Sequence, residues 1–506
     1  MYSFEINLIP SFFFLIAMKS WIAQALFFLL SFASYAQGPA EMVYRRGSLN
    51  VAFINDYKNL PVQKQAVIQD VVNSYKVSDK YNIHQVTDNF IDLSDYSVTF
   101  EEIQPYEQEK KFGGKLLDKY MSYEQKARWG YLDESKVDPI VIAKINKYLE
   151  DCHIPGYLVT KWFNMSDNRV DDSFFNMDLI MERGAYGATT LDRLRSNESL
   201  RKSTLLMDAG MDLIPNTFLV LIRLNYMSFK EWHLMLAEEY RKLAEKQEKK
   251  AREEDKHSVA GISVRIVRDE AGEAKRKEDL LKSAAMNREL ADKQVVEAAE
   301  DGEGYIVSAT TYLYQLIWDN QISDDFLSKY YNMDTPQDLI SNNVFHVKYV
   351  GRMNCQTMLK ESVLLNYEEN QILKDVTLEV IDKAFAKLQR KYEDFAVKAP
   401  IIDVEGNFAT AFVGLKEGIT SRSKFDVLEL NYNEKKDIYR YEKVGSLSVD
   451  KKRVWDNRYG GNRLEILSDD ENGEQDDIEG ANGVDRSYFK ITGGKVSPGM
   501  IIRQSK

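Results

Sequence analysis

An acidic segment near the C-terminus has the residue types and part of the spacing of a calcium-binding loop. Ser468, Asp470 and Asn472 occupy alternate positions, Gly473 follows directly, and Glu479 stands at the twelfth position counted from Ser468. In calcium loops of this kind, oxygen ligands at the first, third, fifth and twelfth positions surround the cation, and the glycine permits a sharp turn. This spacing leads to the hypothesis that Ser468, Asp470, Asn472 and Glu479 bind calcium.

Three departures from the calcium-loop pattern favour an alternative, a solvated acidic loop. Ser468 stands where a carboxylate is usual, and Gln475 stands where an apolar residue normally packs. The surrounding residues are typical of a β domain and not of two flanking helices. The rest of the sequence contains no cofactor motif, so calcium is the one cofactor that we consider.

A second group of residues combines side chains that are frequent in binding surfaces. Trp455, Arg458 and Tyr459 lie within five residues of one another, and Trp, Tyr and Arg are enriched at binding hot spots. We therefore hypothesise a recognition surface formed by this segment and the turn before Met500. The alternative is a strand with Trp455 in the core.

No catalytic motif stands out in the sequence. The five histidines lack the spacing of a two-histidine zinc motif on a helix, and no Gly-x-Ser-x-Gly turn occurs. His153 directly follows Cys152, but a catalytic cysteine and its base are normally brought together by the fold and are not neighbours in sequence. With 79 acidic residues, a pair of carboxylates for glycoside hydrolysis can always be found. The sequence favours a non-enzymatic protein, and the alternative is an exported hydrolase acting on glycan or peptide.

The N-terminus has the pattern of a secretory signal peptide. Met18 and Lys19 precede an apolar run, Trp21–Ala33, and small residues flank the expected cleavage after Ala36. We predict a signal peptide over residues 1–36, with the true start at Met18. The alternative is an uncleaved anchor over residues 8–33, but Lys19 in its middle would cost roughly 2.5 to 3.5 kcal/mol in lipid. The sequence thus predicts a periplasmic or secreted protein without a membrane span after cleavage.

Composition and net charge limit the classes of partner that this protein can bind. Apolar residues make up 44% of the chain, enough for sizeable cores. The net charge of −12 argues against nucleic acid, because phosphate binding needs clustered Lys and Arg. We expect a periplasmic or envelope protein as partner, and the oligomeric state is open. In an oxidising compartment, Cys152 and Cys355 are either a disulfide or two buried free thiols.

Hydrophobic patterning predicts several of the main elements. Thr217–Leu224 is continuously apolar, which is typical of a central strand, and residues 305–316 and 344–350 are its expected partners. Tyr157–Phe163 also resembles a strand. Residues 376–395 have the periodicity of an amphipathic helix. The segment between the first two of these strands, residues 236–303, is predicted to be a charged helical arm, without the sustained heptads of a long coiled coil.

These elements predict a multi-domain α+β protein. We expect an N-terminal mixed domain at 37–195, an α+β domain at 196–398 that contains the charged helical insertion 236–303, and a C-terminal β domain at 399–506. Short apolar runs separated by Gly, Asn and Asp predict a small antiparallel barrel or sandwich for the last of these.

The order of an α+β unit and a small β domain, with Gly414-Leu415-Lys416-Glu417-Gly418 before Phe425–Glu429, resembles exported envelope-assembly proteins of the flagellar-assembly and curli-transport kind. Gln37 after the cleavage site and the stretch Trp455–Tyr459 also resemble secreted proteins of Bacteroidota. The resemblance implies a role in the cell envelope together with other proteins. The resemblance assigns no functional residue in this sequence.

Overall fold

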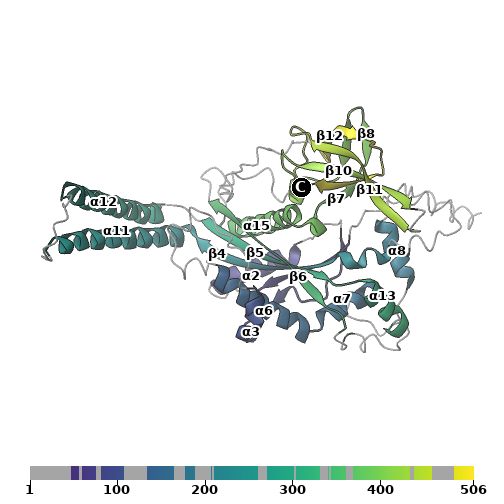
Figure 1. Ribbon diagram of the computed structural model, residues 1–506, viewed down its shortest axis with the longest axis horizontal. Coiled ribbons are helices and arrows are strands. Elements are labelled where there is room, and N and C mark those ends of the chain that lie inside the picture. The colour runs from purple at the N-terminus through teal and green to yellow at the C-terminus, as the bar shows by residue number, and fades with distance from the viewer. Residues whose placement is uncertain are drawn as a thin grey trace, which may run out of the picture. The chain divides into compact units, whose positions relative to one another are not determined.

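The computed structural model describes residues 47–55, 60–75, 81–106, 134–163, 177–187, 207, 210–259, 270–300, 304–330, 340, 344–360, 368–433, 438–457 and 484–505. The predicted signal peptide, residues 1–36, lies outside these residues. The described elements confirm an α+β protein with one mixed sheet, a helical insertion and a curled antiparallel sheet in the C-terminal region (Figure 1).

The first sheet is mixed, with the order β2-β1-β4-β5-β6 and β3 paired to β1. Its strands are β1 (Ser48–Ile54), β2 (Asn82–Ile83), β3 (Phe90–Ile91), β4 (Thr217–Ser228), β5 (Gly304–Leu316) and β6 (Val347–Lys360). Strand β1 runs parallel to β2, β3 and β4, whereas β4, β5 and β6 are antiparallel neighbours. The predicted strands at 217–224 and 305–316 are confirmed, and the third lies mainly in β6.

Helices cover both faces of this sheet. Phe218, Val220 and Ile222 of β4 belong to a core cluster with α2 (Val62–Ser74) and α15 (Glu369–Lys391). Leu219 and Leu221 point to the opposite face, where they pack with α6 (Glu134–Asp151) and α7 (Ile154–Phe163). Because alternate side chains of β4 meet apolar helices on either side, the strand has to be apolar throughout. The helix predicted at 376–395 is confirmed as α15.

One predicted strand is wrong. Residues 157–163 form most of α7, and nearly the whole helix is buried. Leu158 packs beneath the sheet, whereas Val159, Trp162 and Phe163 join a separate cluster with Ile180 of α8 (Met177–Gly187). A helix buried on several sides loses its polar face, so its sequence becomes as uniformly apolar as that of a buried strand.

The charged insertion consists of two long helices between paired strands. Helix α11 (Phe229–Val259) begins directly after β4, and α12 (Glu270–Glu300) ends shortly before β5. Each has 31 residues, a length of about 46 Å at 1.5 Å per residue. The two helices pack against each other (Figure 1).

The smaller helical elements are α3 (Phe100–Ile103), η1 (Gln104–Tyr106), η2 (Ile214–Asn216), α13 (Asn320–Asp325), η3 (Phe326–Tyr330), η4 (Glu393–Phe395) and η5 (Leu415–Glu417).

The C-terminal β domain is a curled antiparallel sheet with its own core, as predicted. Its order is β7-β13-β10-β11-β12-β9-β8, and Phe425, Val427 and Phe489 are central in the core. The two outermost strands are neighbours in the chain, so one short segment bonds to both ends of the sheet. The strands are β7 (Lys398–Pro400), β8 (Asp403–Glu405), β9 (Phe408–Ala411), β10 (Lys424–Asn433), β11 (Ile438–Val449), β12 (Ser487–Gly494) and β13 (Ile501–Ser505).

The structure also bears on the predicted boundary at residue 195 and on the cysteines. Strand β1, from the predicted N-terminal domain, pairs with β4 along its whole length, so the two predicted domains share one sheet. Cys355 packs on the α15 face of that sheet and Cys152 on the α6 face, and both are free thiols.

Among the described helices, none has the length and apolar character needed to cross a membrane.

Candidate functional site

The interior of the α11–α12 hairpin is lined by alanines at seven-residue spacing. Ala237, Ala244 and Ala251 of α11 are almost fully buried, and so are their counterparts on the facing side of α12, Ala284, Ala291 and Ala298. Two turns of helix bring every seventh residue back to nearly the same face. Small side chains there allow the two helices to approach closely, so the hairpin is held by a narrow seam and not by a wide apolar core.

Polar side chains complete this seam and fix the antiparallel register. Gln247 donates to Ser283 Oγ (2.9 Å) and accepts from Asn287 Nδ2 (2.8 Å). Nearer the strands, His233 Nδ1 lies 2.8 Å from Gln294 Oε1. Half-buried polar groups that can bond to each other only in one alignment disfavour a slipped register.

One face of the hairpin combines exposed apolar residues with ion pairs between the helices. Arg288 pairs with Glu248 (2.9 Å) and Arg241 with Asp292 (3.9 Å). The hydrogen bond from Arg288 lowers the pKa of Glu248 and keeps this carboxylate ionised. We call this surface the ion-pair face. Its members are Leu234, Glu238, Arg241, Glu245 and Glu248 of α11 and Leu281, Arg288, Asp292, Val295 and Val296 of α12, which share a side of each helix by their spacing.

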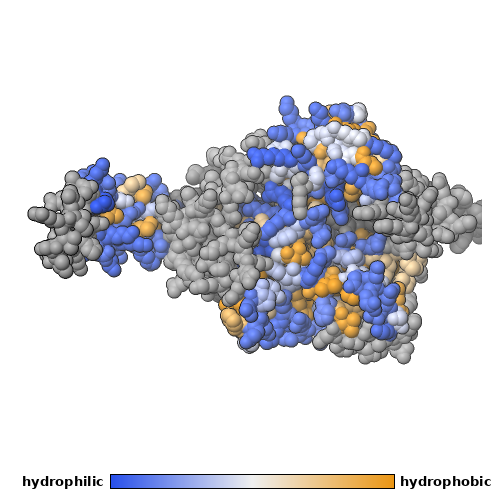
Figure 2. Space-filling model, viewed as in Figure 1, coloured by the Kyte–Doolittle hydropathy of each residue, from blue (hydrophilic) through white to orange (hydrophobic). Residues whose placement is uncertain are grey.

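The apolar residues of the ion-pair face are unusually exposed for their type. Leu234 is 45% exposed, Leu281 44%, Val295 36% and Val296 52%. Figure 2 shows scattered apolar patches among the hydrophilic residues of the hairpin. Met286, which is 63% exposed, projects from the other side of α12 by its helical position.

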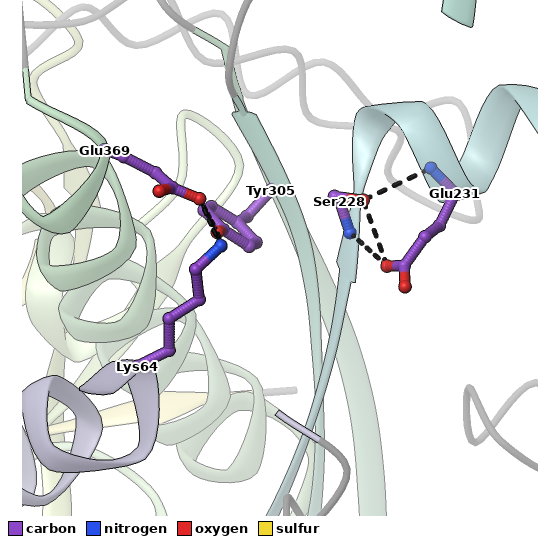
Figure 3. A network of polar contacts seen from close by, with 5 residues as sticks. All are labelled: Lys64, Ser228, Glu231, Tyr305 and Glu369. Atoms are coloured by element: carbon purple, nitrogen blue, oxygen red, sulfur yellow. Dashed lines mark hydrogen bonds and ion pairs between the residues drawn. The ribbon is translucent and has the colours of Figure 1, made fainter. Parts of the chain in front are cut away.

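The first turn of α11 is fixed by a capping box at the root of the hairpin. The Glu231 amide donates to Ser228 Oγ (3.2 Å), and the Ser228 amide donates to Glu231 Oε2 (3.0 Å). Figure 3 shows this reciprocal pair at the end of β4. Such a box satisfies backbone donors that the first helical turn leaves unpaired, so strand and helix are joined without a flexible linker.

Beside the capping box, three polar side chains from different elements converge. Lys64 of α2 forms an ion pair with Glu369 of α15, and the Tyr305 hydroxyl of β5 bonds to the same carboxylate (Figure 3). Partial burial on its own would raise the pKa of Glu369, but the hydrogen bonds from Lys64 and Tyr305 outweigh it and lower that pKa. The network ties both helices of this face to the strand that follows the hairpin.

The segment that contains Trp455 holds a turn of the β domain in place. The Leu415 amide donates to the Trp455 carbonyl (3.0 Å), and the Lys416 amide donates to Asn457 Oδ1 (2.8 Å). Asn457 Nδ2 in turn donates to Glu417 Oε2 (2.9 Å). The stretch 414–418 and the described part of the second stretch, 455–457, therefore meet.

That turn contacts α15 of the mixed-sheet region. Lys416 Nζ lies 3.2 Å from Asp382 Oδ1, and the Tyr75 hydroxyl donates to the same atom (3.0 Å). Desolvation, together with the charge of Asp382, raises the pKa of Tyr75 well above its ordinary value, so this hydroxyl remains a donor. Gly418, at φ +77°, brings its backbone against the Ala386 carbonyl. We call these contacts the junction.

The predicted site residues have different outcomes. Trp455 is half-buried, and its amide donates to Ser487 Oγ (2.9 Å); the described polar contacts of its segment are internal to the protein. Arg458 and Tyr459 lie outside the described residues, as do the calcium candidates Ser468, Asp470, Asn472 and Glu479. In the part of the chain that is described, no three His, Cys, Asp or Glu side chains are grouped so that they could hold a metal.

The buried carboxylates of the described residues have structural partners. Asp382 belongs to the junction, Glu417 accepts from the Gly414 amide (2.7 Å), and Asp426 pairs with Lys443 (2.6 Å). Among the histidines, His84 packs edge-on against Trp162, and His233 lies in the hairpin seam. These carboxylate and imidazole groups therefore take part in contacts that hold the fold together.

Comparison with known proteins finds no family model that matches the chain and no curated protein with significant similarity to it. The candidate site therefore stands on its geometry. The sequence predicted a helical arm without sustained heptads and did not predict the hairpin seam; the pattern that reveals it is alanine at every seventh position of both helices.

Proposed function

We propose that this chain is an exported, non-enzymatic protein of the periplasm or cell envelope that binds or assembles with other proteins through the α11–α12 hairpin. The observation that carries the proposal is the contrast within the hairpin: small alanines are buried between the helices, while leucine and valine side chains of the ion-pair face remain exposed. Exposed leucine and valine side chains within an otherwise polar surface are a feature of many protein-binding sites.

The way the hairpin is attached supports this role. Helix α11 continues directly from β4, α12 ends shortly before the paired strand β5, and the capping box and the Lys64–Tyr305–Glu369 network fix the root. A binding surface carried on a rigid support loses less conformational entropy when a partner binds. Export, predicted from residues 1–36, and the resemblance to envelope-assembly proteins support the proposal that such a partner is an envelope protein.

The alternative function, an exported hydrolase with a carboxylate pair, gains no specific support from the described contacts. Asp382, Glu417 and Asp426 are engaged by cationic or backbone groups. A hydrolytic pair would instead need two carboxyl groups facing a shared substrate position.

The proposal is tested by crosslinking in the source cells, with a tagged chain and identification of the captured envelope proteins. A shortened variant replaces residues 245–286 with a short Gly-Ser linker, which keeps the root with His233 and Gln294. The matched control is the full-length chain with Lys246→Ala and Lys249→Ala, two exposed positions on the hairpin. We expect a reproducible envelope partner that the control retains and the shortened variant loses. A chain that captures no envelope protein contradicts the proposal.

A further inference from the structure

A group of polar side chains interrupts one apolar face of the mixed sheet, the face that packs against α6 and α7. Alternation along β4, β5 and β6 places these side chains on that face. We call the group the polar patch, and its members are Arg223, Asn225, Ser308, Thr310, Arg352, Asn354 and Gln356. Apolar residues bound it on two sides. Leu221 and Tyr312 belong to the core under α6, and Met227 and Ile306 belong to the cluster at the hairpin root.

The strand register makes the polar patch continuous. Two rows cross the sheet from β4 to β6, Arg223–Thr310–Asn354 and Asn225–Ser308–Gln356. Arg352 lies in the next row, where it pairs with Tyr312. Side chains paired across neighbouring strands have Cβ atoms about 4.5 to 5.5 Å apart, so one small molecule can contact several members of the patch at once.

The chemistry of the polar patch is that of a donor-rich, cationic surface. Each of its seven side chains carries at least one hydrogen-bond donor, and none of the seven is acidic. Arg223 and Arg352 lie on the two outer strands, which are about 10 Å apart across β5. Arg352 is only 3% exposed, whereas Arg223 is half-buried at the edge. Guanidinium groups in a partly dry environment are suited to carboxylate and phosphate oxygens.

Asn225 gives an independent indication that a ligand belongs in the patch. Its side chain is 8% exposed, and within the described part of the chain its Nδ2 atom finds no hydrogen-bond acceptor. A buried donor that lacks an acceptor destabilises a fold, so native proteins keep few of them. An anionic oxygen bound in the patch would accept from this amide.

A β-bulge in β6 directs Arg352 into the patch. The register between β5 and β6 shifts next to Gly351, so Tyr349 and Arg352 face the same side of the sheet although they are three positions apart. On the α15 side, Lys391 Nζ and the Tyr392 hydroxyl both donate to the Arg352 carbonyl (2.8 Å each), which fixes the backbone there. Bulges frequently lie beside functional sites, where they redirect a side chain.

The position of the patch in the sheet is also typical of a ligand site. Strand β1 pairs with β4 only as far as Ile54 and Arg223, so Asn225 lies beyond the carboxyl end of β1. From β1 the chain passes through α2, on one face, to β2 and β3, and it returns through α6 and α7, on the opposite face, to β4. In α/β sheets, ligands bind outside the carboxyl ends of strands where the connections change sides in this way.

We infer that the polar patch binds a small anionic molecule through its carboxylate or phosphate oxygens. Arg223 and Arg352 hold the anionic group by charge-assisted hydrogen bonds. The amide of Asn225 and the hydroxyls of Ser308 and Thr310 fix its orientation. The half-buried edge of the patch gives access from solvent. This site is separate from the hairpin and goes beyond the proposed function.

Isothermal titration calorimetry of the purified mature chain tests this inference. Inorganic phosphate and citrate are titrated separately at constant ionic strength, so that general screening of charge does not contribute. We expect saturable binding of one molecule per chain for at least one probe, with a dissociation constant below about 1 mM. Tighter binding of phosphate indicates a phosphorylated ligand, and tighter binding of citrate indicates a carboxylate ligand.

Substitutions in the patch locate the binding. Arg223→Gln should weaken it at least about tenfold, because a charge-assisted hydrogen bond is lost. Gln356→Glu, at the half-buried edge, should also weaken it, because it places a like charge beside the anion; this variant serves if the first does not fold. The matched control is Arg422→Gln, which removes the same charge at an exposed position of the β domain and should leave the dissociation constant unchanged. Circular dichroism verifies the folding of each variant.

Two results would overturn the inference. One is that neither probe binds up to about 10 mM, a concentration well above the expected dissociation constant. The other is that Arg422→Gln weakens binding as much as Arg223→Gln, which would mean that the anion responds only to net charge. Capture of envelope proteins by the hairpin is measured separately, so a failure here leaves the proposed function intact.

Discussion

At the scale of single residues, the described polar groups mainly position the hairpin and the β domain. Glu369 shows this well, because it binds Lys64 and Tyr305 at the hairpin root (Figure 3). Its lowered pKa is accounted for by these two donors. A perturbed carboxylate can mark a catalytic site, but here the partners explain it as a structural contact.

The lowered pKa of Glu369 predicts a defined dependence of stability on pH. The folded state binds this proton more weakly than the unfolded state, so the contribution is fully present above the ordinary pKa of 4.5 and is lost as the pH falls through the lowered value. Because both partners are partly exposed, we expect Glu369→Gln to cost about 0.5 to 1 kcal/mol at pH 7.

Urea denaturation at several pH values measures this contribution. The difference between Glu369→Gln and wild type should shrink below pH 4.5. Glu368→Gln, the exposed neighbour that precedes α15 without a side-chain cap, is the control and should change stability little at any pH. An equal cost for Glu369→Gln at pH 7 and pH 3 would contradict the proposed network.

At the scale of elements, strands with partners on both faces were predictable, and helices buried on several sides were not. Residues 217–224 were identified because β4 must be apolar on both faces, whereas residues 157–163 have an equally apolar composition and form α7. Local sequence does not distinguish these two environments. The hairpin helices were expected, but their seam was not, since alanine carries little weight in a hydrophobic pattern.

The alanine seam predicts that added volume separates the helices. Ala244→Leu would place three more carbon atoms at a fully buried position between α11 and α12, at a cost of about 1 to 3 kcal/mol in local stability. Hydrogen exchange of the hairpin amides, which reports local opening, should show reduced protection.

Ala285→Leu is the matched control for the seam. It makes the same chemical change on the adjacent helix at an exposed position, so protection should be nearly unchanged. If both variants exchange at the wild-type rate, the seam is not closely packed. If both lose protection equally, the effect is not specific to the seam.

At the scale of the whole molecule, two separate cores are connected through the junction. The mixed-sheet core includes α15, the β domain has its own core, and Lys416, Asp382 and Gly418 lie where the two meet. The sequence predicted the C-terminal β domain, but it divided the mixed-sheet region at residue 195, between strands of one sheet. It could not predict that segments 414–418 and 455–457 come together on α15, because that contact joins residues about 40 positions apart through the fold.

Two glycines with positive φ offer a direct comparison at the junction. A Cβ at Gly418 (φ +77°) would lie 2.7 Å from the Ala386 carbonyl oxygen, whereas at Gly406 (φ +59°) no described heavy atom lies within 4 Å. Gly406→Ala should therefore cost only the left-handed backbone penalty, about 1 to 2 kcal/mol. Gly418→Ala should cost about 2 to 4 kcal/mol, since a steric clash is added.

Thermal and urea denaturation of both variants measure this difference. A larger loss for Gly418→Ala, with the β domain separating as an earlier transition, agrees with a closely packed junction. Equal losses would mean that the backbone of the turn does not approach α15 as closely as the structure shows.

The central claim is that the hairpin is the binding element of an envelope protein, and position-specific photo-crosslinking in the source cells tests it most directly. A photoreactive residue is placed at Leu281, on the ion-pair face, or at Lys250, an exposed position on the other side of the hairpin. The account predicts defined adducts with envelope proteins from position 281, and none from position 250. Absence of adducts from position 281, or an equal pattern from both positions, would contradict it.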